Sequence, residues 1–256
     1  METIRRTFLA ALLLAASAAQ ALAGDVHVMI SGALTEAYNR LRPAFEQQTG
    51  HRLVTSYGAS MGQAPDAIPQ RLARGEPADL IILASGGFDA LVQRNLAIAG
   101  SRVDLVNSGI ALAVRAGQPR PDISTVDALR QALLAAPSIA YSASASGVYY
   151  ETTLVDRLGI RDQVMPRSRR IMSERVGTVV ARGDAALGLQ QTSEMLPIPG
   201  IEIIGPLPAE VQRMTIFSAG LPAHVQNREG AAALIAFLRG PVAEPVIRAT
   251  GLDPIR

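Results

Sequence analysis

The sequence contains no cysteine, no tryptophan and no lysine, and only 4% of its residues are aromatic. The absence of cysteine excludes disulfide bonds, thiol catalysis and cysteine metal sites. The three histidines, His27, His51 and His224, lack the spacing of a metal site, so we expect no metal and no other cofactor. The zinc-protease motif H-E-x-x-H and the phosphate-loop motif G-x-x-x-x-G-K-[ST] are also missing. The chain must therefore fold on its apolar core alone.

The N-terminal stretch has the three-part pattern of a secretory signal peptide. Arg5 and Arg6 supply a positive start, and residues 8–16 form an apolar run. Ala21-Leu22-Ala23 fits a signal-peptidase site. The apolar run is shorter than the roughly 20 residues that a transmembrane helix needs. We therefore expect residues 1–23 to be a cleaved signal peptide, with the remaining chain exported to the periplasm and not inserted in a membrane; an uncleaved amphipathic start is the alternative.

Charges of both signs are nearly balanced along the chain. The 24 basic residues, all arginine, stand against 22 acidic ones, for a net charge of +2. Because no long basic block occurs, nothing in this pattern points to a nucleic-acid partner. A hydrophobic share of 48% and the length of the chain suffice for one large or two modest domains. We expect a monomer that acts on a small molecule.

Strand and helix patterns alternate along the chain, which predicts an α/β fold with doubly wound sheets. Strands are predicted over residues 26–30, 51–57, 79–84, 108–115, 138–141, 169–172, 186–191, 201–205 and 214–220, and helices over 34–48, 67–74, 88–95, 127–136, 147–158, 176–182 and 229–239. We interpret this order as two lobes joined by two hinge strands. Lobe 1 would comprise residues 24–106 and 214–256, and lobe 2 residues 107–213. One continuous α/β domain is the alternative that the pattern leaves open.

Four loops share one feature: each follows a predicted strand, carries small or hydroxyl residues, and precedes a predicted helix. They cover residues 31–33, 58–62, 142–147 and 173–175. Backbone N–H groups at helix starts have no intrahelical partner, and together with serine hydroxyls they bind oxyanions and carboxylates. Any one such loop is typical of ordinary helix capping. Four of them at corresponding strand ends favour an anion site between the lobes.

The candidate ligand-binding residues come from these loops, from a helix start and from the end of one strand. They are Ser31, Gly32, Ala33, Ser60, Met61, Ser144, Ser146, Gly147, Arg175, Val176 and Gln191. Arg175 is the charge best suited to an anion, and Arg213 is a weaker candidate. Gln190 next to Gln191 adds a second amide. Tyr149 and Glu151, which follow the third loop, are the candidate proton carriers if the protein is an enzyme.

Several stretches resemble the periplasmic molybdate-binding proteins of ABC transporters, which have the type 2 periplasmic-binding-protein fold. The most specific are residues 75–80 (GEPADL) and 182–188 (RGDAALG); shorter ones are 33–35 with the helix through Gly50, the loop ending in Ser60, and 146–149. The resemblance implies a two-lobed receptor that traps a small anion and docks on an ABC permease. It also implies oxyanion donors at residues 31–33, at Ser60, at Ser146 and at the helix start at residues 175–176.

Two departures from that family favour a larger, organic anion. Gln191 stands where the family has a tyrosine, and the segment between Ser60 and Arg74 is longer. Residues 59–62, 67–74 and 140–149 resemble instead the branch of this fold that includes a periplasmic aconitate isomerase. This resemblance implies an alternative function, the interconversion of cis- and trans-aconitate, with Ser60, Ser146 and Arg175 holding the substrate. At the level of the sequence, transport and isomerisation both stay open, and a ligand carrier for a chemoreceptor, without a transporter, is a third interpretation.

Overall fold

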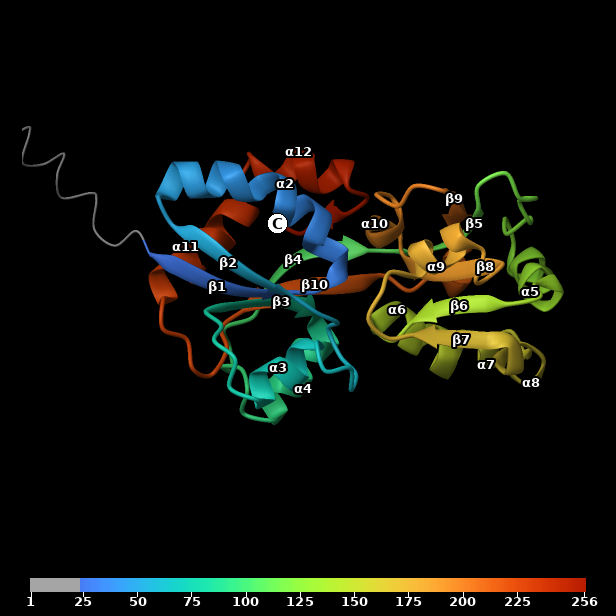
Figure 1. The fold of residues 1–256 in the computed structure, drawn as a ribbon, viewed down its shortest axis with the longest axis horizontal. Helices are drawn as coiled ribbons and strands as arrows, with labels where there is room; N and C mark the ends of the chain where they lie inside the picture. The colour runs from blue at the N-terminus through green and yellow to red at the C-terminus, as the bar shows by residue number, and fades with distance from the viewer. Residues whose placement is uncertain (1–23) are drawn as a thin grey trace, which may run out of the picture.

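The structure is a computed structural model that describes residues 24–256, so the expected signal peptide lies outside the described residues. Two separate β-sheets, each flanked by helices, form two lobes that lie side by side (Figure 1). The sheet of lobe 1 has the strand order β11-β4-β10-β3-β1-β2, and that of lobe 2 has the order β7-β6-β8-β5-β9. The predicted two-lobed α/β fold is therefore confirmed.

Lobe 1 is built from the first third and the last part of the described chain. Its strands are β1 (Asp25–Ile30), β2 (Arg52–Tyr57), β3 (Leu80–Ala84), β4 (Val103–Ser108), β10 (Thr215–Gly220) and β11 (Asp253–Pro254). Its helices are α2 (Gly32–Thr49), α3 (Ile68–Ala73), α4 (Ser85–Gln93), α11 (Arg228–Leu238) and α12 (Ala243–Ala249). Strands β2, β1 and β3 are parallel, whereas β10 returns late in the chain and lies antiparallel between β3 and β4.

Lobe 2 is built from the middle of the chain. Its strands are β5 (Ile110–Arg115), β6 (Ile139–Ser142), β7 (Ser168–Ile171), β8 (Leu187–Gln191) and β9 (Ile201–Pro206). Its helices are α5 (Val126–Ala135), α6 (Ala145–Tyr149), the π-helix η1 (Tyr150–Leu154), α7 (Val155–Arg157), α8 (Arg161–Val164), the 3-10 helices η2 (Met165–Arg167) and η3 (Ala209–Val211), α9 (Val176–Arg182) and α10 (Thr192–Met195). The helix expected over residues 147–158 is thus one helical run from α6 to α7, with a π-helical turn in its middle.

The chain crosses between the lobes twice, and polar contacts tie the two crossings together. The first crossing is the step from β4 to β5 at Gly109, and the second is the segment 207–214. The side-chain amide of Gln212 pairs with both backbone groups of Ile110, accepting from its N–H at 3.0 Å and donating to its carbonyl at 2.9 Å. The two crossings therefore lie next to each other, as a paired hinge requires.

Helix α2 shows why the sequence folds as it does in lobe 1. Leu34, Tyr38, Leu41 and Phe45 recur at helical spacing, and all four are buried in the core of lobe 1. Gly50, with φ of +75°, ends the helix in the left-handed conformation. Among residues 24–256, no single helix is both long and apolar enough to cross a membrane; α11 and α12 reach that length only as a pair bent by 66°.

Candidate functional site

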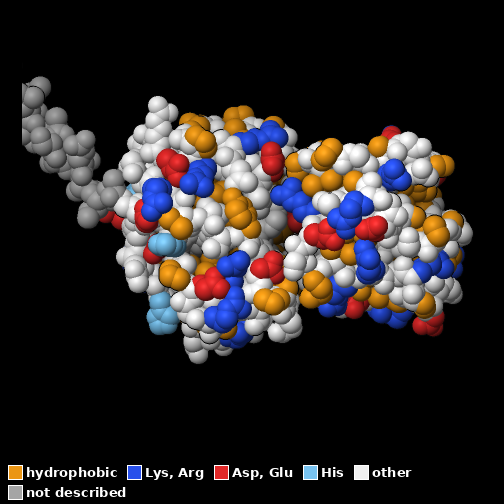
Figure 2. Space-filling view, viewed as in Figure 1, with side chains coloured by type: hydrophobic (Ala, Val, Ile, Leu, Met, Phe, Trp, Pro, Cys, Tyr) orange, Lys and Arg blue, Asp and Glu red, His pale blue; other side chains and the backbone are white. Residues whose placement is uncertain are grey.

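A cavity of about 300 Å³ lies between the two lobes, at the narrowing of the molecule that Figure 2 shows. Lobe 1 lines it with the start of α2, the end of β2 and the loop that follows. Lobe 2 lines it with the end of β6, the loop before α9, the end of β8 and α10. All four loops singled out in the sequence contribute lining residues: Ser31, Gly32, Gly58, Ala59, Ser60, Ser142, Ala143, Ser144, Ser173, Glu174 and Arg175.

The start of α2 offers the cavity an unused hydroxyl. Ser31 precedes the helix, is 2% exposed and makes no side-chain capping bond. Its Oγ has no hydrogen-bond partner among the described residues. An orphaned hydroxyl at this depth calls for a partner, since burying one without a hydrogen bond is costly. The helix behind it is 18 residues long, so its dipole also favours a negative charge here.

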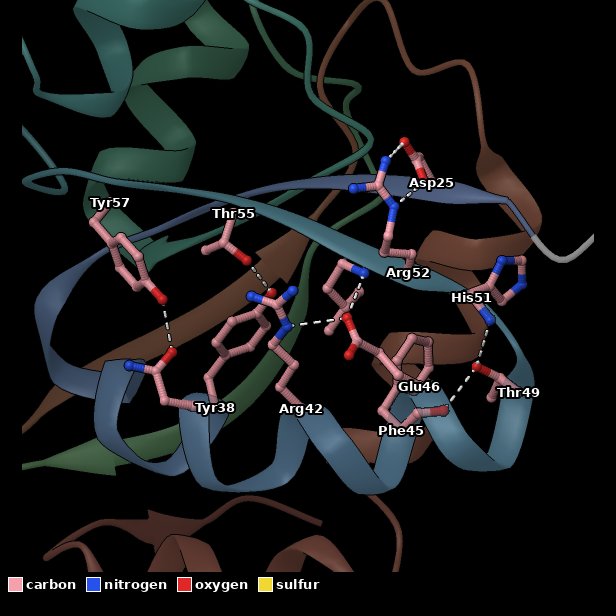
Figure 3. A network of polar contacts seen from close by, with 12 residues as sticks. Asp25, Tyr38, Arg42, Phe45, Glu46, Thr49, His51, Arg52, Thr55 and Tyr57 are labelled. Atoms are coloured by element: carbon pink, nitrogen blue, oxygen red, sulfur yellow. Dashed lines mark hydrogen bonds and ion pairs between the residues drawn. The ribbon is translucent and has the colours of Figure 1, made fainter.

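Polar contacts between α2 and β2 hold that helix in place (Figure 3). The Tyr38 hydroxyl lies 2.6 Å from Thr55 Oγ1, and burial raises the pKa of Tyr38 to about 12. Glu46 accepts hydrogen bonds from the Leu53 N–H at 2.8 Å and from Arg42 at 3.0 Å. The first of these bonds, to the backbone, is the main cause that lowers the pKa of Glu46. The middle and the second half of α2 are thus tied to β2.

Two further serines keep a hydroxyl proton for the cavity. Ser60 Oγ accepts from the Ala84 N–H at 2.9 Å, and Ser142 Oγ accepts from the Ser144 N–H at 2.8 Å. Because each oxygen is used as an acceptor, each O–H proton can be donated to a ligand. Residues 58–62 (GASMG) do have the letters of the G-x-S-x-G motif of serine hydrolases. Among residues 24–256, no histidine lines the cavity to activate Ser60, so binding is the role that fits this hydroxyl.

Lobe 2 supplies the charge of the site. Arg175 is the only cationic side chain among the lining residues, and it forms no ion pair with any of residues 24–256. Glu174 beside it is held by Arg182, at 2.8 Å and 3.1 Å, and this ion pair lowers the pKa of Glu174. Asp66 of lobe 1 accepts from Ser173 at 3.4 Å across the gap. The guanidinium of Arg175 is therefore free to meet an anion.

Glu194 is an acid that the sequence analysis did not single out. It lies in α10, lines the cavity and accepts from Gln190 Nε2 at 2.6 Å. Gln190 Oε1 in turn accepts the Val176 N–H at 2.8 Å, so this amide is fixed at both ends. Burial raises the pKa of Glu194 to about 7, although Arg175 and Gln190 act in the opposite direction. The cavity thus holds a carboxyl group that can exist in either protonation state near neutrality.

Of the predicted binding residues, Ser31, Gly32, Ser60, Ser144 and Arg175 line the cavity. The others lie close by but do not line it. Ala33 is part of the core of lobe 1; Ser146 and Gly147 are buried in the first turn of α6; Val176 is buried in α9; Met61 lines a neighbouring cavity of about 380 Å³; and the Gln191 amide lies 3.2 Å from Thr215 Oγ1 at the crossing between the lobes. Gln190, the neighbour of Gln191, is the glutamine that reaches the site.

Neither of the two predicted proton carriers lines the cavity between the lobes. The Tyr149 hydroxyl donates to the Val211 carbonyl at 2.8 Å, and its ring lines the neighbouring cavity together with Met61. Glu151 forms an ion pair with Arg170 of β7. Among the described residues, no group of three or more His, Asp or Glu side chains is arranged to hold a metal.

Gly147 acts on the site through packing, which gives a first prediction. A β-carbon at Gly147 would lie 1.5 Å from the Ser142 carbonyl oxygen, a backbone atom that cannot simply rotate away. We expect Gly147→Ala to lower the free energy of unfolding by about 3 kcal/mol and to displace Ser142 from the cavity. Denaturant unfolding measures the first effect. Gly86→Ala is the control, because a β-carbon there meets nothing within 4 Å; equal stability of the two variants would contradict the argument.

Two α/β lobes, two crossings and a cavity lined from both sides define a two-lobed binding protein of the type 2 periplasmic-binding-protein fold. Residues 26–253 match the family of bacterial extracellular solute-binding proteins, and the chain belongs to this family.

The relatives of the chain fall into two kinds. A protein named aconitate isomerase from a Pseudomonas species is 44% identical over 228 residues, which cover 89% of this chain and 87% of that protein. The periplasmic molybdate-binding protein of Azotobacter vinelandii superposes with a TM-score of 0.68 at 21% identity, covering 90% of this chain and all of that one. A sulfate-binding protein of Mycobacterium tuberculosis gives 0.68 at 19%, covering 91% and 87%. The solved structures confirm the fold, and the resemblance found in the sequence is confirmed as well.

Proposed function

We propose that this protein is an exported aconitate isomerase, which interconverts cis- and trans-aconitate in the cavity between its lobes. The observation that carries the proposal is the make-up of that cavity: hydroxyl donors from both lobes surround a single free cation, Arg175. The 44% identical relative named aconitate isomerase directs the choice of substrate. Export to the periplasm is part of the proposal, supported by the pattern of residues 1–23 and by the extracellular character of the family.

The size of the cavity favours a tricarboxylate over a single inorganic oxyanion. A tetrahedral oxyanion has the bulk of only a few water molecules, each of about 30 Å³. The cavity of about 300 Å³ leaves room for a six-carbon acid. Its donors are also spread over several places, with Ser31 and Ser60 in lobe 1 and Ser142 and Arg175 in lobe 2. Separate donors suit separate carboxylates on one carbon skeleton.

The reaction needs binding groups and one proton acceptor. A proton leaves the methylene carbon of aconitate, and its C–H bond pair joins the conjugated system of double bond and carboxylates. The proton is returned to the former vinyl carbon, so the double bond moves by one position and nothing is oxidised or reduced. Donors that hold the carboxylates stabilise the charge that develops on them. No cofactor is required for this allylic shift.

The second candidate is passive capture of an anion for an ABC permease. The molybdate- and sulfate-binding neighbours favour it, since they share this fold. The two candidates differ in what happens to the ligand. A receptor releases its anion unchanged, whereas an isomerase converts trans-aconitate into cis-aconitate until equilibrium is reached.

Two measurements on the purified protein without residues 1–23 test the proposal. First, we expect trans-aconitate to be converted, as followed by ultraviolet absorbance and by proton NMR. Second, we expect both aconitates to raise the melting temperature, because a ligand at 100 times its Kd stabilises the folded state by about 2.7 kcal/mol. Molybdate and sulfate serve as comparison anions. Tight binding of either anion without turnover of aconitate would instead establish the receptor.

A further inference from the structure

We propose that Glu194 is the catalytic residue that removes the allylic proton and returns it to the other end of the same allyl system. This inference rests on the proposed function and adds to it the group that carries out the chemistry.

The Glu194 carboxyl group lies at the contact between the two lobes. Helix α10 belongs to lobe 2 and packs against α2 of lobe 1. The Glu194 carboxyl lies directly against the first residue of α2, since a β-carbon on Gly32 would be 2.1 Å from Oε2 and 2.5 Å from Cδ. The unpartnered hydroxyl of Ser31 belongs to the same helix start. A substrate carboxylate bound there would bring its adjacent carbon next to Glu194.

The orientation of the Glu194 carboxyl group is fixed by its amide neighbour. Because Gln190 Oε1 accepts the Val176 N–H, its Nε2 must face Glu194, where it donates to Oε2. Oε1 of Glu194 has no hydrogen-bond partner among the described residues, so it is the oxygen available for a proton. A carboxylate that has one oxygen held by a fixed amide loses little conformational entropy when its other oxygen accepts a proton.

Both protonation states of Glu194 are accessible near neutral pH. A general base works best when its pKa lies near the working pH, and burial raises the pKa of Glu194 to about 7. Helix α10 packs against α2, β5, β8 and α9, and Arg175 before α9 is the charge that acts on it. The other charged residues of these elements are Glu36, Arg40, Arg42 and Glu46 in α2, Arg115 in β5 and Arg182 in α9; the acids Asp66 and Glu174 line the same cavity.

The other acids and the tyrosine that line the cavity are less suited to accept the allylic proton. The ion pair with Arg182 lowers the pKa of Glu174 and so makes it a weaker proton acceptor. Tyr57 is 44% exposed, and its hydroxyl donates to Asn39 at 2.7 Å. The Asp66 carboxylate already accepts from Ser173 Oγ at 3.4 Å. Glu194 is therefore the lining residue that combines partial burial, a fixed amide partner and contact with the helix start.

A single residue, Glu194, carries out both proton transfers of the isomerisation. In the forward direction, ionised Glu194 takes the methylene proton, and the C–H electron pair spreads over the allyl system. The neutral acid then gives the proton to the carbon at the far end, where a new C–H bond forms and the double bond shifts. Glu194 ends in its starting state.

The test is Glu194→Gln, with Asp66→Asn as the rival and Glu202→Gln, an exposed acid of β9, as the control. We expect kcat for trans-aconitate to fall by about 10²- to 10⁴-fold in Glu194→Gln, with KM changed less than threefold, because the amide keeps the shape and the bond to Gln190. Glu202→Gln should match the wild type. Glu194→Asp, whose carboxylate is one methylene further away, should keep an intermediate rate. The wild-type kcat/KM should rise with pH through a midpoint near 7, the pH at which Glu194 loses its proton.

The outcomes of these measurements distinguish failure of the proposed function from failure of the assignment of Glu194. A wild-type protein that does not convert aconitate overturns the proposed function and this inference with it. A wild type that does convert it, beside a folded Glu194→Gln of near-normal kcat, overturns only the inference, as does a loss of turnover in Asp66→Asn alone. If Glu194→Gln does not fold, Glu194→Asp and the wild-type pH profile still decide, and a rate independent of pH between 5 and 9 counts against Glu194.

Discussion

Replacing Asp79 by alanine is expected to lower the free energy of unfolding by at least about 4 kcal/mol. Asp79 is 3% exposed and stands just before β3. One carboxylate oxygen accepts the His27 N–H of β1 at 2.8 Å, and the other accepts the N–H groups of Gln226 at 2.9 Å and Asn227 at 2.7 Å. Alanine leaves three backbone donors without a partner, and each hydrogen bond to a charged group contributes about 1.5–3 kcal/mol.

Chemical denaturation measures this loss, and two variants bracket it. Asp89→Ala removes an exposed carboxylate whose ion pair with Arg102 should contribute less than about 1 kcal/mol. Asp79→Asn keeps one acceptor oxygen but turns an amide N–H toward backbone donors, so we expect a loss between those of the other two variants. If Asp79→Ala is no less stable than Asp89→Ala, the three bonds are not what ties β1 and β3 to the start of α11.

This result would also explain a sequence motif. Residues 75–80 (GEPADL) are the most specific likeness to the molybdate-binding proteins, yet Asp79 does not line the cavity. Its bonds join β1 to residues 226 and 227, which lie 147 and 148 residues after Asp79 in the chain. Asp79 therefore stabilises lobe 1. The match of residues 75–80 to the molybdate-binding proteins predicts the fold but does not identify the ligand.

The fold was predictable wherever the apolar pattern is long or continuous. The stripe of α2 and the apolar run Leu80–Ala84 of β3 each bury the residues expected. The sequence analysis missed β4, α8, α10, α12 and β11. Strand β4 reads VDLVNS, in which Asp104 and Asn107 interrupt the apolar run; α10 spans four residues, too few to show a helical period; and Pro245 within α12 argues against a helix.

The binding loops were predictable, whereas the proton carrier was not. Serine and glycine after strands are visible in the sequence, and the doubly wound fold brings the ends of these strands to one cavity. Which of two adjacent glutamines faces that cavity depends on the register of β8, because neighbouring side chains of a strand point to opposite faces. Gln190 faces the cavity, and Gln191 faces the crossing at Thr215. Glu194 gives no signal in the sequence, because its role depends on a lobe-to-lobe contact with Gly32.

Replacing Arg175 by alanine is expected to reduce kcat/KM for trans-aconitate by about 100-fold. Arg175 is the one free cation of the cavity. Removing one partner of a largely desolvated charge pair costs about 2–5 kcal/mol, and each 1.4 kcal/mol is a factor of ten. Arg175→Lys keeps the charge but loses the planar fork that holds a carboxylate with two hydrogen bonds, so we expect a smaller loss. Arg94→Ala, which removes an exposed arginine that does not line the cavity, is the control for net charge.

The same substitution should also shift the pH dependence of the reaction. The positive charge of Arg175 favours ionised Glu194 and so lowers its pKa against the larger effect of burial. Without that charge, the pKa of Glu194 rises, and the midpoint of the rise in kcat/KM moves to a pH above 7. Arg175→Lys should keep the midpoint nearer to that of the wild type. A 100-fold loss with an unmoved midpoint would mean that Arg175 binds the substrate without acting on Glu194, and the two residues would then contribute to catalysis independently.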